Sequence, residues 1–361
     1  MFKVHIRPHW EISFHGGAPL DTAALLSLLV SVQDTGSIAQ AAKSVKLSYR
    51  YAWGLLREAE KLFGDQLLYT GRGRGTALTP LAQKLVWADR RISARLSPTL
   101  ESLASELEAE LGKMAADRMR MIRMDASHGF AVAALMVHLN KIEMPVELRY
   151  RNSTDAVAAL SRRECDLAGF HVPTGQFEQA AVAWYTRWLD PQQHCLIHLA
   201  VRHQGLFVAP GNPLMIDGLP SLTRCDVRFV NRQVGSGTRM LLELLLADAG
   251  VSAHDIVGFN SAEFTHSAVA AYIASGMADV GFGVRTAAHR FKLDFLPLAR
   301  ERYFFAIRTD ALSDPLVRQL ITVLQTPDYH ARVNELTGYD AADTGTIMSL
   351  EQAFGAGVPR H

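Results

Sequence analysis

Residues 37–63 read SIAQAAKSVKLSYRYAWGLLREAEKLF. A short run of small residues behind Ser37 stops at the break formed by residues 45–47, and a second helical run starts behind Ser48. The first turn of that second run holds two tyrosines and an arginine, which a buried helix would not place there. A fully solvated helix would not carry the tryptophan, leucines and phenylalanine that follow. We therefore expect this first turn to contact a partner outside the chain.

The flanking sequence completes a helix-turn-helix with a wing. Between residues 21 and 34 four apolar residues recur at helical spacing behind an Asp21 or Thr22 cap, so a first helix precedes the two described above. Gly64 then ends the third helix. Residues 67–79, LLYTGRGRGTALT, predict a β-hairpin whose tip is basic and rich in glycine, as a wing requires.

A helix-turn-helix places the first turn of its third helix against base edges in the major groove of DNA. Arg50 could pair there with guanine or with a phosphate, and Arg57, two turns on, could reach a phosphate. The two wing arginines would reach the backbone or the minor groove, whereas Trp53 belongs mainly to the core. The expected DNA-binding residues are Ser48, Tyr49, Arg50, Tyr51, Arg57, Arg72 and Arg74.

The stretch GSIAQAAKSVKLSYRYAWGLLREAEKLFGDQLL, with the glycine-rich wing and ALTPLAQKLV behind it, resembles the winged helix of ModE-type molybdate-responsive regulators. The SY-x-x-AW pattern and the basic wing distinguish it from the related LysR-type regulators. The resemblance covers about residues 20–90 and implies DNA binding. ModE-type proteins continue into small β-barrel ligand domains, which this sequence does not, so their ligand residues cannot be transferred.

The composition indicates a soluble globular protein of two or three domains, with 361 residues, 48% of them hydrophobic and 20% charged. Residues 40–95 hold 11 Lys and Arg against 4 Asp and Glu, while the rest holds 26 against 32, so a basic module precedes a mildly acidic one. Residues 3–14 predict a short strand or hairpin. With no secretory leader and no bilayer-length apolar run, the expected location is the cytoplasm.

A long helix is expected from Pro80, with Pro98 bending or restarting it. Leucines continue along it from Leu96 to Leu111 at spacings of 4, 3, 4 and 4. Such a stripe belongs either to an intramolecular core or to a helix–helix dimer seam. Because it lies between two domains, we favour the dimer, and a homodimer or higher homo-oligomer is the expected assembly.

Strand-like and helical runs alternate from residue 119 onward, which predicts an α/β architecture with room for two lobes. Residues 230–246, VNRQVGSGTRMLLELLL, predict a strand, a glycine turn and a helix from Thr238. Such a helix start points backbone N–H groups at an anion, Ser236 adds a hydroxyl, and Arg232 or Arg239 could add a charge. It is not a P-loop, because the lysine is missing.

Further polar turns follow other strands, at the edge where open α/β sheets bind ligands. Together they predict one cleft between the two lobes. The expected ligand-binding residues are Ser127, His128, Asn152, Ser153, His171, Arg232, Ser236, Gly237, Thr238, Arg239, Thr265 and His266.

This arrangement resembles the type II periplasmic-binding-protein fold in the cytoplasmic form attached to helix-turn-helix regulators. AGFHVP, LFVAPGNP, NRQVGSGTR and THSAVAAYIASGMADVGFGVR carry the resemblance over about residues 120–340. It implies the fold and a ligand cleft, in which Ser127, Asn152, Ser153, Ser236, Thr238 and Thr265 would donate hydrogen bonds. Extracellular relatives often take molybdate, tungstate, phosphate or sulfate there.

Other functional classes find little support. No nucleophile elbow, HExxH, P-loop or dinucleotide fingerprint occurs, so an enzyme is not expected. The 14 histidines include no metal-ligand pair near the cleft, and the three scattered cysteines suit buried thiols, so neither metal nor cofactor is expected. A transport-type binding protein would not carry the basic first domain.

The sequence therefore predicts a multi-domain protein: an α-rich winged helix-turn-helix over residues 1–80, a linker and dimerisation helix over 81–117, and a two-lobed α/β periplasmic-binding-protein-like domain over 118–361. Its expected function is one-component transcriptional regulation, with double-stranded operator DNA and a small effector as partners. The effector expected is an oxyanion such as molybdate or tungstate. The alternatives are a small organic or molybdenum-cofactor-related metabolite, or a cytoplasmic ligand-binding protein without a regulatory role.

Overall fold

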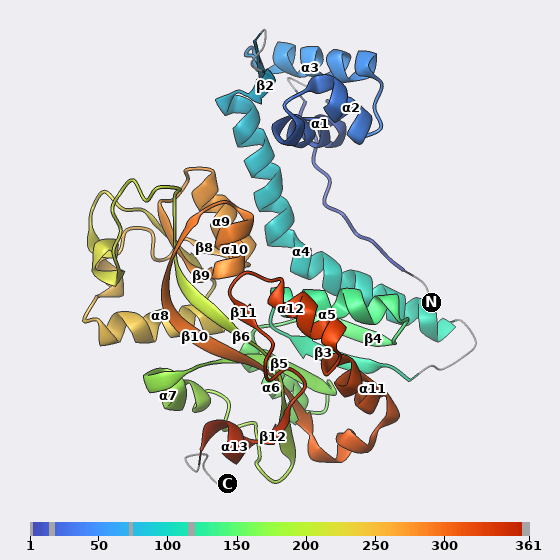
Figure 1. Ribbon diagram of the computed structural model, residues 1–361, viewed down its shortest axis with the longest axis vertical. Coiled ribbons are helices and arrows are strands. Elements are labelled where there is room, and N and C mark those ends of the chain that lie inside the picture. The colour runs from blue at the N-terminus through green and yellow to red at the C-terminus, as the bar shows by residue number, and fades with distance from the viewer. Residues whose placement is uncertain (1–2, 14–18, 72–74, 115–119, 356–361) are drawn as a thin grey trace. The chain divides into compact units, whose positions relative to one another are not determined.

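The computed structural model describes residues 3–13, 19–71, 75–114 and 120–355. The chain divides into two compact units (Figure 1). One is Arg7–Leu96, and the other combines Met1–Ile6 with Ser97–His361.

The unit Arg7–Leu96 is the winged helix-turn-helix that the sequence predicts. The first three helices begin at side-chain caps, since Asp21, Ser37 and Ser48 accept the backbone N–H groups of Ala24, Gln40 and Tyr51. Their apolar faces and the hairpin enclose one core. The elements are α1 Thr22–Thr35, α2 Ile38–Ser44, α3 Tyr49–Phe63, β1 Leu68–Gly71, β2 Gly75–Leu78 and the start of α4, Pro80–Met114.

One local prediction is wrong, and one of two alternatives at Pro98 is excluded. Described residues 3–13 form no strand, and only an isolated bridge joins Ile12 to Leu20, because no neighbouring strand accepts their hydrogen bonds. Residue 14, the end of the predicted segment, and Gly16 and Gly17, which would turn a hairpin there, lie outside the described residues. The sequence predicts that Pro98 either bends or restarts the long helix, and the restart is excluded, since α4 runs for 35 residues with Pro98 inside it.

The second unit is built on one mixed sheet with the strand order β4-β3-β5-β10-β6-β9-β7-β8. Parallel strands β3, β4 and β5 form the sheet of the first lobe, and parallel strands β7, β8 and β9 that of the second. The strands are β3 Ile122–Ala126, β4 Val146–Tyr150, β5 Leu167–Pro173, β6 His194–Val208, β7 Phe229–Arg232, β8 Ala262–Glu263, β9 Val280–Val284 and β10 Asp294–Arg308, while β11 Tyr339–Asp340 and β12 Ile347–Ser349 pair with β6.

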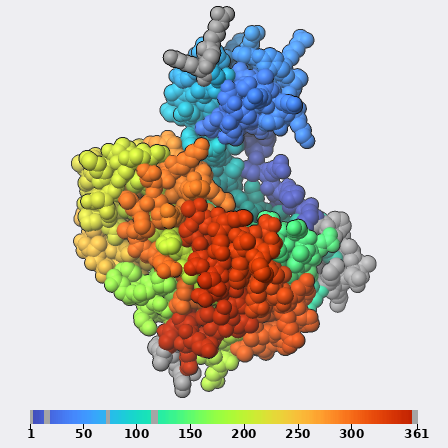
Figure 2. Space-filling view, in the orientation of Figure 1, coloured from blue at the N-terminus to red at the C-terminus, as the bar shows by residue number. Residues whose placement is uncertain are grey.

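Helices cover both faces of each lobe, and alternate strand residues supply a separate apolar core on each face. In the space-filling view the red carboxy-terminal segment lies beside the yellow and orange chain of the second lobe (Figure 2). The first lobe carries α5 Phe130–Lys141, α6 Ser153–Ser161, α7 Glu178–Val182, α11 Pro315–Leu324, α12 Pro327–Asn334 and α13 Leu350–Phe354, and the second carries α8 Gly237–Asp248, α9 His266–Ala274 and α10 Arg285–Arg290.

The two 15-residue strands β6 and β10 run antiparallel to each other through both lobes. Their register places Arg202 opposite Glu301, and irregularities at Pro297/Ala299 and Tyr303/Phe304 lie on either side of that pair. The lobes therefore share a two-strand connection whose middle carries a buried ion pair. None of the helices in the described ranges is both long and apolar enough to cross a lipid bilayer.

Candidate functional site

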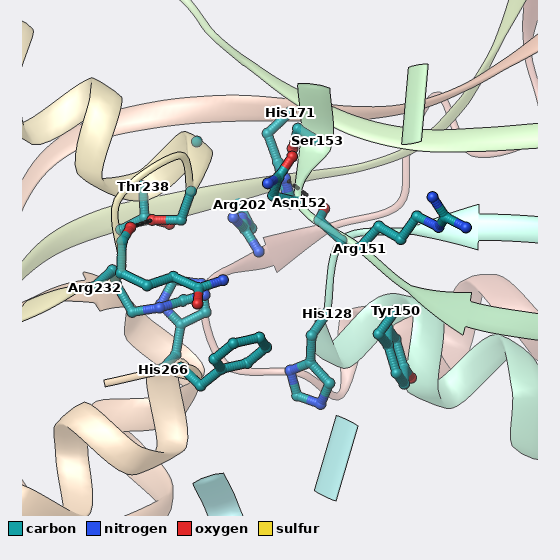
Figure 3. Close-up of a pocket in the computed structure, with 15 residues that line it drawn as sticks. His128, Tyr150, Arg151, Asn152, Ser153, His171, Arg202, Arg232, Thr238 and His266 are labelled. Carbon is teal, nitrogen blue, oxygen red and sulfur yellow. Dashed lines mark hydrogen bonds between the residues drawn. The ribbon is translucent and has the colours of Figure 1, made fainter. Parts of the chain in front are cut away.

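A small cavity lies where the strand ends of the two lobes meet. The centre of a water-sized sphere can reach about 30 Å³ of its interior. A space of this size suits a compact ligand rather than a large one. Its walls come from both lobes and from the connecting strand β6 (Figure 3). The lining residues are Ser127, His128, Tyr150, Arg151, Asn152, Ser153, His171, Arg202, Arg232, Gln233, Ser236, Gly237, Thr238, Phe264 and His266.

Four helices begin at this cavity, two from each lobe. Lining residues stand at or just before the first turns of α5, α6, α8 and α9. The first N–H groups of a helix lack intrahelical partners and carry the positive end of the helix dipole. Four such ends around one small space favour an anion.

Two buried arginines reinforce that preference. Arg202 of β6 is 1% exposed and Arg232 at the end of β7 is 6% exposed. Among the described residues, Nη1 of Arg202 and both Nε and Nη1 of Arg232 have no hydrogen-bond partner. Burial, and then the charge of Arg202, lowers the pKa of Arg232 to about 9, while Glu301 opposes the shift. A buried guanidinium with unpartnered N–H groups is costly, and an anion in the cavity would supply the missing acceptors.

Glu301 fixes the orientation of the Arg202 guanidinium at the cavity. Its Oε1 accepts hydrogen bonds from Nε of Arg202 and from Nε2 of Gln204. The same Gln204 nitrogen lies 3.1 Å from Oγ1 of Thr238 at the start of α8. One carboxylate therefore connects the strand pair between the lobes to a helix start in the second lobe.

Three histidines line the cavity in the neutral state. Burial, followed by the charges of Arg232 and Arg202, lowers the pKa of His128 to about 3. Burial with the same two arginines also holds the pKa of His171 and of His266 well below its usual range. A neutral imidazole can donate or accept, and Nδ1 of His171 is already 3.0 Å from Oγ of Ser127.

Neutral buried histidines make the folded protein sensitive to acid. Below the unfolded-state pKa of about 6.5 the unfolded chain binds protons that the folded chain does not, so stability is complete above that pH and falls below it, by about 1.4 kcal/mol per pH unit for each histidine. Between pH 7.5 and 5.5, denaturant unfolding should show this loss. His171→Gln should reduce the difference by about 1.4 kcal/mol, whereas His254→Gln, at an exposed site, should not. An unchanged pH dependence in His171→Gln would contradict the neutral assignment.

The structure brings together most of the predicted ligand-binding residues, and two do not line the cavity. Arg239 pairs instead with Glu243 on the next turn of α8. The step of about 100° between adjacent helical residues turns Arg239 away from the cavity that Thr238 lines. The Thr265 hydroxyl caps α9 by accepting the N–H of Ala268. Whether the remaining residues bind a ligand stays a prediction.

Two predicted hydroxyl and amide donors also serve as helix caps. The Ser236 hydroxyl donates to the carbonyl of Gln233 and accepts the N–H of Arg239. Asn152 is held by Asp155 and Thr154. At these helix starts, backbone N–H groups and the Thr238 hydroxyl are therefore the better donors for a ligand.

The sequence interpretation missed five lining residues: Tyr150, Arg151, Arg202, Gln233 and Phe264. A charged residue within the apolar run LIHLAVRHQGLFV was a usable signal for Arg202. Its partner Glu301 stands 99 residues away, so no local pattern could pair them.

In the helix-turn-helix unit the first turn of α3 is exposed, as the DNA prediction requires. Tyr49 is 55% exposed and Tyr51 46%, and Ser48, Arg50 and Arg57 are exposed too. The Tyr51 hydroxyl donates to Asp21, and the Arg57 guanidinium lies 6.0 Å from the centre of the Trp53 ring. Trp53 packs against the core as expected. Arg72 and Arg74 lie outside the described residues.

Comparisons with known families agree with this organisation. Residues 24–83 match the family of bacterial regulatory helix-turn-helix proteins of the lysR type, and residues 135–325 match the PBP superfamily domain. YvgK of Bacillus subtilis, described as an uncharacterized protein, is 33% identical over 215 residues, which are 59% of this chain and 69% of YvgK.

Shorter matches point to molybdenum-related proteins. The transcriptional regulator ModE of Haemophilus influenzae is 46% identical over 63 residues, 16% of this chain and 25% of ModE. The molybdenum-pterin-binding protein MopB of Rhodobacter capsulatus is 27% identical over 145 residues, 39% of this chain and 53% of MopB.

A solved structure of OxyR from Corynebacterium glutamicum aligns with a TM-score of 0.44 and 13% identity, covering 88% of this chain and 94% of that one. The family matches rest on the sequence, and the PBP superfamily domain alone spans more than half of the chain. The chain therefore belongs to the PBP superfamily and joins that domain to a lysR-type helix-turn-helix, which makes it a LysR-type transcriptional regulator with a PBP-like ligand-binding domain.

Proposed function

We propose that this regulator senses a small oxyanion in the cavity between its two lobes, with molybdate and tungstate as the leading candidates. The observation that carries the proposal is the pair of buried arginines, with unpartnered N–H groups, at the meeting point of four helix starts. These groups would bind oxygen atoms on several sides of a compact anion.

The local charge supports a doubly charged ligand. Glu301 compensates Arg202, and Asp125 lies 2.9 Å from Arg151, whereas Arg232 has no such carboxylate in contact among the described residues. The remaining positive charge and the helix ends would balance a dianion.

The lining also favours an anion that carries no proton. No aspartate or glutamate lines the cavity in the part of the chain that the structure describes. Hydrogen phosphate carries a proton that a carboxylate would accept best, whereas the lining offers it only the weaker neutral acceptors of imidazole, hydroxyl and amide groups. Molybdate, tungstate and sulfate are fully deprotonated at neutral pH, and the names of the relatives ModE and MopB support the first two.

A second candidate is a small organic acid or a molybdenum-cofactor-related metabolite. Aromatic groups at the cavity favour it, since the rings of His128 and Tyr150 are 4.9 Å apart and Phe264 is 41% exposed. Such a ligand would place its acid group at the arginines and its organic part against these rings.

We further propose that the regulator acts in the cytoplasm as a homodimer or higher homo-oligomer on operator DNA, with α4 at the interface. Leu103 and Leu107 of α4 are 47% and 45% exposed, as expected for leucines that the α4 helix of a second copy would cover. Ligand binding acts as a switch only if one DNA-binding pose takes the ligand better than the other.

Thermal unfolding of the full chain with sodium molybdate, tungstate, sulfate or phosphate tests the ligand. At 100 times its dissociation constant a ligand adds about 2.7 kcal/mol to the folded state. We expect the transition of the ligand-binding unit to rise with molybdate or tungstate and to stay in place with phosphate. A shift with none of the four anions would overturn the oxyanion proposal and favour the organic metabolites.

A further inference from the structure

The second half of α4 closes the open edge of the ligand-binding sheet. Strand β4 is the outermost strand of the first lobe, so its outward backbone groups have no neighbouring strand. Two serines of α4 take that place. Oγ of Ser105 accepts the N–H of Leu148, and Oγ of Ser102 accepts the N–H of Tyr150, each at 2.8 Å. Two serines three residues apart on the helix therefore accept hydrogen bonds from two residues that are two apart on the strand.

The Ser102 hydroxyl also contacts the part of α4 that leads to the other unit. It donates to the carbonyl oxygen of Pro98 at 2.9 Å. Proline removes one backbone hydrogen bond from a helix and weakens it locally. The chain passes from one compact unit to the other between Leu96 and Ser97, one residue before this proline.

The strand residue held by Ser102 is itself part of the cavity wall. Tyr150 lines the cavity, and its ring lies edge-on to His128 at 4.9 Å (Figure 3). Burial, and then the charge of Glu101 on α4, also raises the pKa of Tyr150 well above its usual range, which keeps the phenol neutral beside the helix. One residue therefore contacts both the ligand space and the linker helix.

We propose that Tyr150 and Ser102 transmit ligand occupancy from the cavity to α4 at Pro98. This proposal rests on the proposed function, since it needs a ligand in the cavity and DNA as the readout. A ligand that moves His128 and Tyr150 changes the hydrogen bond to Ser102, and with it the support of the helix next to its weakest point. The two states of the regulator then differ in this contact.

The test removes the Ser102 hydroxyl in the full chain. DNA is a duplex selected by the wild-type protein from a random pool, and the readout is the ratio of its dissociation constants with and without sodium molybdate. Allosteric ratios are typically about 5 to 150. In Ser102→Ala we expect the ratio to approach 1, while the thermal shift with molybdate and the DNA affinity without it stay near wild type.

Two further variants separate transmission from damage to the fold. Ser102→Thr keeps the hydroxyl and should restore the ratio. Ser105→Ala removes the other hydroxyl of α4 that bonds to β4, at Leu148, which does not line the cavity, and should leave the ratio unchanged. A wild-type ratio in Ser102→Ala, or a ratio near 1 in both Ser102→Ala and Ser102→Thr, overturns the transmission proposal. If wild type itself shows neither a thermal shift nor a change in DNA affinity with molybdate, tungstate, sulfate or phosphate, the proposed function fails first.

Discussion

Arg232→Met should abolish the stabilisation by the anion while leaving the ligand-free protein as stable as wild type or more stable. The guanidinium is buried, and two of its nitrogens lack partners among the described residues. Removing it relieves an uncompensated charge, and methionine fills a similar volume. The ligand would lose two charge-assisted hydrogen bonds, at about 1.5–3 kcal/mol each. A concentration of molybdate that stabilises wild type by about 2.7 kcal/mol should then have almost no effect.

Arg239→Met is the matched control for this experiment. Arg239 stands seven residues further on in the same segment, pairs with Glu243 on the helix and does not line the cavity. Its replacement should keep the full molybdate shift. A wild-type shift in Arg232→Met, or equal losses in both variants, would contradict the assignment of Arg232 as the ligand-facing arginine. Denaturant unfolding without ligand measures whether Arg232→Met is at least as stable as wild type.

The parts of this site that the sequence predicts are those defined by short-range rules. A polar turn behind a buried strand and in front of a helix identifies a helix start, as at Ser127, Asn152 and Ser236. The helix-turn-helix follows from the same rules, because its caps at Asp21, Ser37 and Ser48 each act within three residues. Such local signals predict the folded structure well because they depend on few neighbouring residues.

The parts that the sequence could not predict depend on contacts between distant segments. The pairing of Arg202 with Glu301 follows from the register of β6 and β10, which folding alone determines. The prediction of a strand or hairpin over residues 3–14 is wrong because a strand needs a hydrogen-bonded neighbour, and the sequence does not show whether one is present. Arg239 shows a third limit, because a one-residue step on the helix separates Thr238, which lines the cavity, from Arg239, which is buried against Phe259 instead.

Arg50→Ala should weaken binding to the selected DNA by about 5- to 150-fold, corresponding to the 1–3 kcal/mol typical of one base contact. Arg50 is exposed in the first turn of α3, where a recognition helix presents its side chains to the major groove. The thermal shift with molybdate should stay intact, because the cavity lies wholly within the other compact unit. Electrophoretic mobility shift assays at several salt concentrations measure the effect.

The control Lys61→Ala removes one positive charge from the last turn of the same helix and should change DNA affinity much less. The salt dependence separates the two contacts that Arg50 could make. If Arg50 binds a phosphate, affinity falls for every sequence and the slope of log K against log salt drops by about 1. If Arg50 binds guanine, only the selected sequence loses affinity, since non-specific binding depends on phosphate contacts alone. Undiminished binding by Arg50→Ala would contradict the assignment of Arg50 as a DNA contact of the recognition helix.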